Sequence, residues 1–368
     1  MLALFALVTS YDRVNILFSM ADQLRFDALS SVTPSLHTPN LDQMAKEGVR
    51  FSKAYSSTPT CTPARAALLT GRSPWGHGML GYGKVAQHYP FEFPRALASS
   101  GYETHSVGKD HFGWNNSLGV KGGRAYAHSY ESLHIYDGRI GEPDQYRAWF
   151  GTQVNSSRSP ESCWPTLDMN SWRGAANICD ERLHPTAWAG REAVAFLKDH
   201  ADAGIDVLHP PFLLKLSFHR PHSPYDPPDR LLNATSASSI PMPVRPLGGW
   251  SAPFAHCEVT SPPEADSWCG QKDAAAESLS RRAYHASIRF MDEQIGKVHA
   301  ALTSTGLLAR TLWLFTADHG DAQGDHWHWR KGCAHAKSQT QPSTRLPALP
   351  CLAWPCLALP CPRLASLP

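Results

Sequence analysis

The sequence lacks several features that would have narrowed its function at once. It has no Cys-x-x-Cys pair, no apolar run near the roughly 20 residues that a membrane span needs, and a formal net charge of only +2. The first absence argues against a zinc cluster, and the second argues against a transmembrane anchor. The small net charge gives no reason to expect nucleic acid or an anionic membrane as a partner.

The composition is that of a globular protein with a substantial core. Hydrophobic residues make up 42% of the 368 residues and charged residues 18%. This length suits either two average domains or one large α/β domain with an appendage. Any partner must therefore be inferred from particular sites.

The nine cysteines leave the redox compartment open. Cys61 stands alone, and a middle group consists of Cys163, Cys179, Cys257 and Cys269. The middle four could form one or two disulfides if the chain is exported, or they could be buried free thiols. The sequence favours neither alternative.

Two features favour the secretory pathway or the extracellular space. Residues 1–12 begin with MLALFALVTS, which is similar to the end of a signal sequence without its basic region. Asn-x-Ser/Thr sequons occur at Asn115, Asn155 and Asn233. We expect residues 1–12 to be a signal remnant.

Strands and helices are predicted to alternate along the chain. The apolar run at 14–20 predicts a buried strand, and further strand candidates lie at 102–107, 212–218 and 311–318. Apolar residues at helical spacing predict helices at 38–47, 185–200 and 279–306. This alternation predicts an α/β fold with a mostly parallel central sheet flanked by helices. In such folds ligands bind beyond the carboxyl ends of the strands.

Charged or imidazole side chains follow each of the four predicted strands. They are Asp22 and Gln23, Lys109 and His111, His219 and His222, and Asp318 and His319. Any one of them alone would be taken for a solvated loop residue or a helix cap. Their recurrence after four strands indicates a functional site at one edge of the sheet.

These residue types suit a cation and an anion held side by side. Carboxylates at Asp22 and Asp318 are the oxygen ligands that calcium or magnesium prefers. Cationic or imidazole donors would surround the metal and bind a tetrahedral oxyanion; they are Arg65, Lys109, His111, His222 and Lys331. These residues alone do not distinguish sulfate from phosphate.

Residues 61–72 read CTPARAALLTGR, which resembles the sulfatase signature Cys-x-Pro-x-Arg followed by a helix and Thr-Gly-Arg. Four further segments resemble sulfatase motifs in family order: NILFSMADQLRFDAL, GKDHFGW, SFHRPHSPY and FTADHGDAQGDHWHWRKG. Together the five motifs span residues 14–332. The chain thus resembles the formylglycine-dependent, arylsulfatase-like sulfatases, which implies the alkaline-phosphatase-like fold.

The resemblance implies a modified nucleophile and a metal ion. A formylglycine-generating enzyme would convert Cys61 to Cα-formylglycine, whose hydrated aldehyde attacks sulfur. One divalent metal ion, calcium in most of the family, would be held by Asp22, Gln23, modified Cys61, Asp318 and His319. The implied substrate is a small-molecule or carbohydrate sulfate ester.

The resemblance also assigns roles to the cationic residues. Lys109 and Lys331 would bind the sulfate oxygens, and Arg65 would favour the oxyanion nucleophile. His222 would protonate the leaving alcohol, a role that His219 could take instead. His111 would act on the second hydroxyl of the hydrated aldehyde, so that sulfate is expelled and the aldehyde regenerated.

Two alternatives stay open at this point. Gln23 stands where many sulfatases have a second aspartate, a departure that also suits a phosphonate monoester or phosphodiester hydrolase. The second alternative is a truncated, inactive sulfatase-like protein. We expect an incomplete catalytic domain at 13–332 and an aberrant tail at 333–368, where recurring proline is incompatible with an ordinary helix or strand.

Residues 112–180 are rich in glycine, serine and asparagine and show weak periodicity. They predict long loops over the pocket, where substrate choice would reside.

Overall fold

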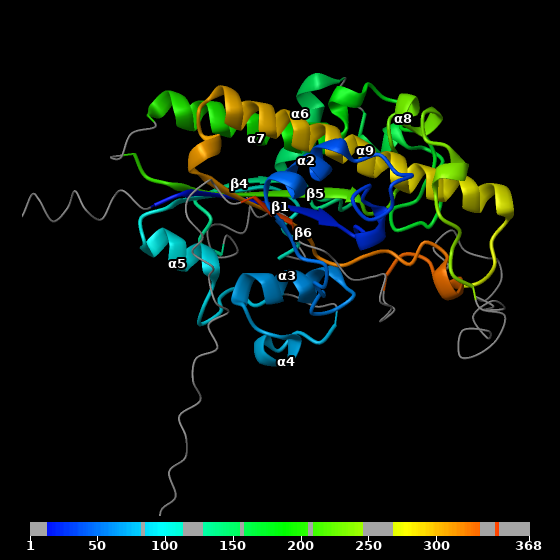
Figure 1. Cartoon of the computed structure of the whole chain (residues 1–368), viewed down its shortest axis with the longest axis horizontal. Coiled ribbons are helices and arrows are strands. Elements are labelled where there is room, and N and C mark those ends of the chain that lie inside the picture. Colours follow the sequence, from blue (N-terminus) through cyan, green and yellow to red (C-terminus); the bar gives the residue numbers. More distant parts are fainter. Residues whose placement is uncertain are drawn as a thin grey trace, which may run out of the picture.

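The computed structural model describes residues 13–81, 85–112, 128–154, 158–204, 209–245 and 268–331, together with the backbone of 343–345. One central sheet lies between two layers of helices (Figure 1). Helices α2, α6, α7, α8 and α9 lie on one side of the sheet, and α3, α4 and α5 lie on the other. The predicted fold class, a sheet flanked by helices, is confirmed.

The sheet of the described residues has seven strands in the order β2-β7-β6-β1-β5-β3-β4. The strands are β1 (Asn15–Asp22), β2 (Val49–Arg50), β3 (Glu103–Gly108), β4 (Ser132–Ile135), β5 (Phe212–Pro221), β6 (Thr311–Ala317) and β7 (Ser343–Arg345). Strands β6, β1, β5, β3 and β4 pair in parallel with their neighbours. Strands β7 and β2 form an antiparallel edge.

The four predicted strands are neighbours in the middle of this sheet. Ile16 of β1 pairs with Leu213 of β5 on one side and with Leu312 of β6 on the other. Every residue of β5 is buried because helices cover both faces, which explains why its first half is rich in apolar residues. Parallel pairing brings the polar residues that follow these strands to one edge.

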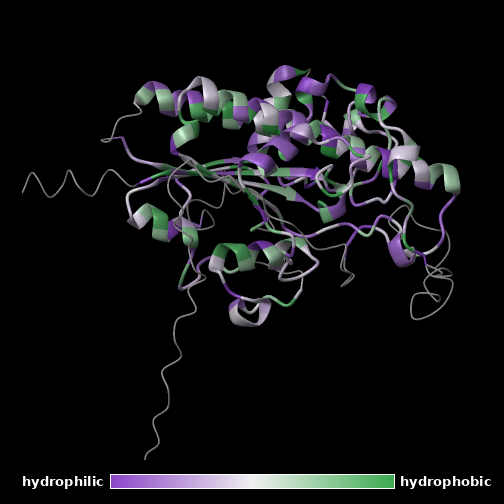
Figure 2. Cartoon of the chain, viewed as in Figure 1, coloured by the Kyte–Doolittle hydropathy of each residue, from purple (hydrophilic) through white to green (hydrophobic). Residues whose placement is uncertain are grey.

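The helices supply both outer layers. They are α2 (Pro39–Glu47), α3 (Cys61–Thr70), α4 (Pro74–His77), α5 (Phe93–Ser99), α6 (Gln145–Gln153), α7 (Pro185–Ala203), α8 (Asp229–Asn233) and α9 (Ala274–Ser304). The apolar stripe of α9, including Tyr284, Ile288, Met291 and Ile295, is buried in the core as expected. Figure 2 shows hydrophobic residues in the central strands and on helices of both layers.

Two expectations differ from the structure. The region 112–180 was expected to form long loops, but it also contains β4 and α6. Strand β4 pairs with β3 and extends the sheet, and α6 contacts β4. The proline-rich tail contributes β7, whose three residues lie between Pro342 and Pro347 and pair with β6. Proline cannot donate a ladder hydrogen bond, but the three residues of β7 include no proline. The expectation that the tail forms no strand was therefore wrong for this segment.

The cysteines resolve one of the open alternatives. Cys163 and Cys179 form a disulfide, and Cys269 is also disulfide-bonded. Among the described cysteines, Cys61 is the one free thiol, and it is buried.

The expected signal remnant, two of the sequons and most of the tail lie outside the described residues, whereas Asn233 is exposed at the end of α8. Among the described helices, none combines the length and apolarity that crossing a bilayer requires.

Candidate functional site

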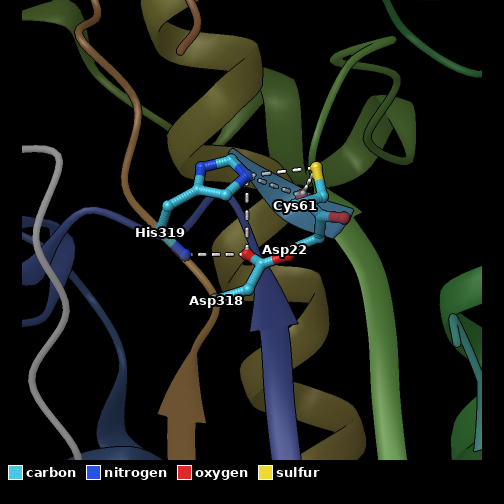
Figure 3. A group of neighbouring side chains, drawn as sticks. All are labelled: Asp22, Cys61, Asp318 and His319. Carbon is cyan, nitrogen blue, oxygen red and sulfur yellow. Dashed lines mark hydrogen bonds and ion pairs between the residues drawn. The ribbon is translucent and has the colours of Figure 1, made fainter. Parts of the chain in front are cut away.

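The predicted site residues meet at the carboxyl edge of the sheet. Asp22 ends β1, Asp318 and His319 follow β6, and Cys61 is the first residue of α3. One ligand atom from each of these four side chains lies within 4.8 Å of the other three, and all four are buried. Figure 3 shows them converging above the ends of β1 and β6.

The signature that begins at Cys61 forms one short helix that ends at a glycine C-cap. Thr60, just before α3, has extended backbone, and Cys61 begins the first turn. The helix ends at Gly71, which adopts φ +66° and donates its N–H to the carbonyl of Ala67. Glycine reaches this left-handed conformation without strain, which explains the Thr-Gly-Arg end of the motif.

Arg65 lies one helical turn after Cys61 and joins the ends of several strands. Its Nε donates to Asp318 Oδ2 at 2.8 Å, and its Nη2 lies 3.3 Å from Asp22 Oδ2. Its Nη1 donates to the carbonyl of Lys109 at 2.7 Å and to Ser217 Oγ at 3.0 Å. Arg65 therefore fixes the two carboxylates of the candidate metal site.

Cationic groups surround the Cys61 thiol. Lys331 Nζ lies 2.9 Å from Sγ, His319 Nε2 lies 3.1 Å from it, and Lys109 Nζ lies 4.0 Å away. Burial and Asp22 raise the pKa of the thiol, but Lys109, Lys331 and His319 outweigh them and lower it. The site stabilises negative charge at this position.

Asp22 is held as a carboxylate by the same cations. Burial raises its pKa, but Lys109, His222, Arg65 and Lys331 together hold the pKa well below its ordinary value. Lys109 Nζ forms an ion pair with Asp22 Oδ2. Both carboxylates of the cluster are thus fixed by buried cationic partners.

Gln23 has one polar atom to offer a cation. Its backbone N–H donates to Asp318 Oδ1 at 3.0 Å, and its Nε2 donates to Asp321 Oδ2. Its Oε1 is buried and has no hydrogen-bond partner among the described residues. An amide oxygen beside two carboxylates fits the predicted divalent metal, because hard cations bind oxygen ligands.

A cavity of about 660 Å³ opens beside Cys61 and contains the remaining predicted residues. Lys109, His111, His222 and Lys331 all line it, and so does His219. The outer wall was missed by sequence reasoning and includes Asp137, Arg139, Glu142, Met169 and Arg330. Most of this wall comes from the region expected to form loops over the pocket.

His222 is bound through both ring nitrogens. Its Nδ1 donates to the carbonyl of Ser223 at 2.7 Å, which leaves Nε2 to accept from Lys331 Nζ at 2.6 Å. Burial, then Lys331 and Lys109, lower the pKa of His222 well below its ordinary value. The ring of His219 lies 4.8 Å from that of His222, and its Nδ1 accepts from Arg220. His222 is therefore the histidine joined to the Lys331–Cys61 pair.

His111 is positioned by an aspartate that the sequence did not reveal. His111 has φ +58°, and its backbone N–H donates to Asp137 Oδ1 at 3.0 Å. Asp137 follows β4, so it obeys the same rule of a polar residue after a strand. Recognising β4 in the sequence would have found it. Burial and Lys109 lower the pKa of His111 well below its ordinary value.

Comparisons with known proteins agree with this geometry. A sequence model of the sulfatase family matches residues 14–349. The chain is 34% identical to an arylsulfatase of Clostridium perfringens over 89% of its own length and 67% of that protein. It is 28% identical to a choline-sulfatase of Rhizobium meliloti, over 86% of its own length and 59% of that protein. It therefore spans about three fifths of several such relatives.

The fold is also found among solved structures. The phosphonate monoester hydrolase of Agrobacterium radiobacter superimposes with a TM-score of 0.72 at 24% identity, over 91% of this chain and 68% of that one. A putative sulfatase of Bacteroides fragilis gives a TM-score of 0.60 at 21% identity, with coverages of 91% and 68%. These similarities establish the alkaline-phosphatase-like fold.

Proposed function

Because this chain belongs to the sulfatase family, we propose that it is a sulfuric ester hydrolase whose nucleophile is made from Cys61. The observation that carries this proposal is the position of Cys61. Its thiol lies between Lys331 and His319, inside a signature helix and beside two fixed carboxylates. A formylglycine-generating enzyme would convert the thiol to Cα-formylglycine. The substrate would be a small-molecule or carbohydrate sulfate ester.

The donor set fits one divalent cation, for which we propose Ca²⁺. Asp22, Gln23, Asp318 and His319 would hold it, with the modified side chain of residue 61 beside them. The cation would supply positive charge that stabilises the nucleophile and the sulfate oxygens. Arg65 holds both carboxylates in place through its ion pairs with Asp22 and Asp318.

The lysines bind and orient the sulfate group. Lys109 Nζ and Lys331 Nζ both approach the position of the Cys61 sulfur, so they present positive charge where the sulfate oxygens would lie. Fixed charges of this kind stabilise the more highly charged transition state without reorganising during the reaction.

Two histidines can move the protons. Lys331 donates to His222 Nε2, so this pair can deliver a proton to the oxygen of the leaving alcohol. The low pKa of His111 keeps its imidazole neutral at pH 7, and its Nδ1 lies 3.4 Å from Thr62 Oγ1, next to residue 61. His111 can therefore accept a proton from the modified side chain.

The first test is the chemistry of residue 61. The chain is co-expressed with a formylglycine-generating enzyme, and the tryptic peptide 54–65 is analysed by mass spectrometry. We expect an aldehyde in place of the thiol, together with hydrolysis of an aryl sulfate by the modified protein. A peptide that stays entirely thiol under these conditions would refute the proposed nucleophile but not the fold.

A second candidate function is supported by Gln23. An amide at this ligand position lowers the negative charge of the metal site by one relative to a carboxylate, and phosphonate monoester hydrolases share this fold. Parallel turnover of an aryl sulfate and an aryl phosphonate monoester by the modified protein separates the two. We expect the sulfate to be cleaved faster, and markedly faster phosphonate cleavage would reverse the assignment.

We further propose that the chain matures in the secretory pathway. The Cys163–Cys179 disulfide supports this proposal, because disulfides persist in oxidising compartments. The exposed position of Asn233 leaves its sequon accessible to glycosylation. A mobility shift on treatment with a glycosidase, using an Asn233→Gln variant as control, would test export in a eukaryotic host.

A further inference from the structure

A second cluster of metal-ligating side chains lies at the opposite end of the sheet. Glu103 begins β3, His200 lies near the end of α7, and His209 precedes β5. One ligand atom from each lies within 4.8 Å of the other two. Strand β3 spans about 20 Å between Glu103 and Lys109, so this cluster is remote from Cys61.

The local structure explains why these groups meet. Glu103 and His105 are two residues apart on β3 and therefore share one face of the sheet. Phe196 and His200 are four residues apart on α7 and share one face of that helix. The rings of His105 and Phe196 lie 4.4 Å apart, and those of His200 and His209 lie 4.5 Å apart. Packing of α7 against β3 thus places the His200 ring next to the Glu103 carboxylate.

The distances are close to those of a metal site. Glu103 Oε2 lies 3.8 Å from His200 Nδ1 and 4.0 Å from His105 Nε2. Any two ligands at the zinc bond length of about 2.1 Å stand roughly 3.4 Å apart in a tetrahedral site. The two separations exceed this spacing by about 0.4 and 0.6 Å.

His105 lies beside this cluster and is held in one orientation. Its Nδ1 is hydrogen-bonded to Ser132 Oγ at 2.8 Å, which fixes the ring. Its Nε2 is buried and has no hydrogen-bond partner among the described residues. A buried nitrogen without such a partner, facing the same carboxylate, is a second and independent sign of a missing ligand.

We propose that Glu103, His200 and His209 form a zinc site, with His105 Nε2 directed at the same carboxylate. Imidazole nitrogen with a single carboxylate suits Zn²⁺, whereas the carboxylates and amide beside Cys61 suit Ca²⁺. The bound ion would join β3, the end of α7 and the chain entering β5. This inference does not depend on the proposed sulfatase activity.

The test measures bound zinc directly and excludes zinc binding at the Cys61 site. All variants carry Cys61→Ala, so that no thiolate at the other site can bind zinc. Each full-length protein is stripped with a chelator and then dialysed against micromolar Zn²⁺ with excess Ca²⁺. Zinc is counted by mass spectrometry, and thermal unfolding is followed with and without the ion.

We expect one zinc ion per chain and a higher melting temperature with zinc in the parent protein. Glu103→Gln and His209→Gln should each weaken zinc binding by more than about 100-fold, because each removes a ligand. Both residues are partly exposed, so these variants should fold.

The matched control is His134→Gln. His134 forms a two-residue pair with Glu192, its Nδ1 lying 2.8 Å from the carboxylate, and its substitution should leave the zinc content unchanged. The proposal is overturned if the parent protein takes up no zinc, or if its zinc content is the same in Glu103→Gln and His209→Gln. An equal loss of zinc in the control would overturn it too.

Discussion

The two ends of the central sheet carry polar clusters of different construction. At the carboxyl end, Asp22 and Asp318 are buried and each is paired with a buried cation. At the amino end, the Glu103 side chain is 39% exposed and its neighbours are imidazoles. The first cluster is rich in oxygen donors and fixed charge, and the second is rich in nitrogen donors.

The difference follows from where each cluster lies. Buried charges are retained only where partners compensate for their desolvation, and Arg65 supplies that compensation between β1 and β6. Partial burial costs a neutral imidazole little desolvation free energy, so the histidines need no compensating charged partner. One scaffold can therefore hold a hard cation at one end and a borderline-soft one at the other.

The Cys61→Ala variant should have the largest effect, and it distinguishes sulfate hydrolysis at the carboxyl end of the sheet from zinc binding at the amino end. This variant removes the precursor of the nucleophile, so we expect the rate of aryl sulfate hydrolysis to fall by about 10⁴-fold or more. Zinc bound by the amino-end cluster should be unaffected. Initial rates and zinc content are measured on the same preparation. Substantial sulfatase activity in this variant would remove Cys61 from the mechanism.

Lys331→Ala should have the next largest effect. Lys331 Nζ lies 2.9 Å from Cys61 Sγ and 2.6 Å from His222 Nε2, so its loss removes sulfate binding and a proton donor. We expect kcat to fall by about 10²–10³-fold. Lys46→Ala, at an exposed position on α2, is the control. Equal rates in the two variants would exclude Lys331 from the reaction.

The pH dependence of folding stability tests the contribution of the buried Asp226 carboxylate near the carboxyl end of the sheet. Burial raises its pKa, but Arg220 and His184 lower it to about 2, below the ordinary value of 3.8. The ionised carboxylate therefore stabilises the fold at pH 4 and above, by about 2 kcal/mol, and this contribution is lost as pH falls toward 2. Asp226→Asn should unfold more easily at pH 7 in urea. It should also show a smaller loss of stability between pH 4 and pH 2, and an unchanged loss there would contradict the assignment.

Glu103→Gln should have the smallest effect on catalysis. The residue lies one strand length from Lys109, so we expect kcat/KM for an aryl sulfate to change by less than about 2-fold, as for other substitutions remote from a site. The same variant should lose zinc. A change of about 10-fold or more in kcat/KM would mean that the two ends are coupled and would end their treatment as separate sites.

The strongest sequence signals were local ones. Strands β1, β5 and β6 are rich in apolar residues, and polar residues follow these strands and β3, so both the sheet and the carboxyl-end site could be predicted. The CTPARAALLTGR stretch marked Cys61 without any structural information. The helical stripe of α9 was equally clear, because its spacing is set by burial of one face.

Other features depend on contacts between distant residues. Strand β4 has four residues, of which one is buried, two are partly buried and one is exposed, and it is defined by pairing with β3. Asp137 was missed together with that strand. Glu103 and His200 are nearly one hundred residues apart in the sequence, and packing of α7 on the sheet brings them together. No spacing rule connects such residues.

The burial of Cys61 and Arg65 sets an order of events in the life of the protein. Their exposed fractions are 0% and 2%, so the conversion that we propose for Cys61 would have to precede the docking of α3 on the sheet. The proposed conversion of the thiol would then compete with folding, and the fraction of active molecules would depend on which of the two is faster. Protein refolded from denaturant without the modifying enzyme should be native in shape and permanently inert.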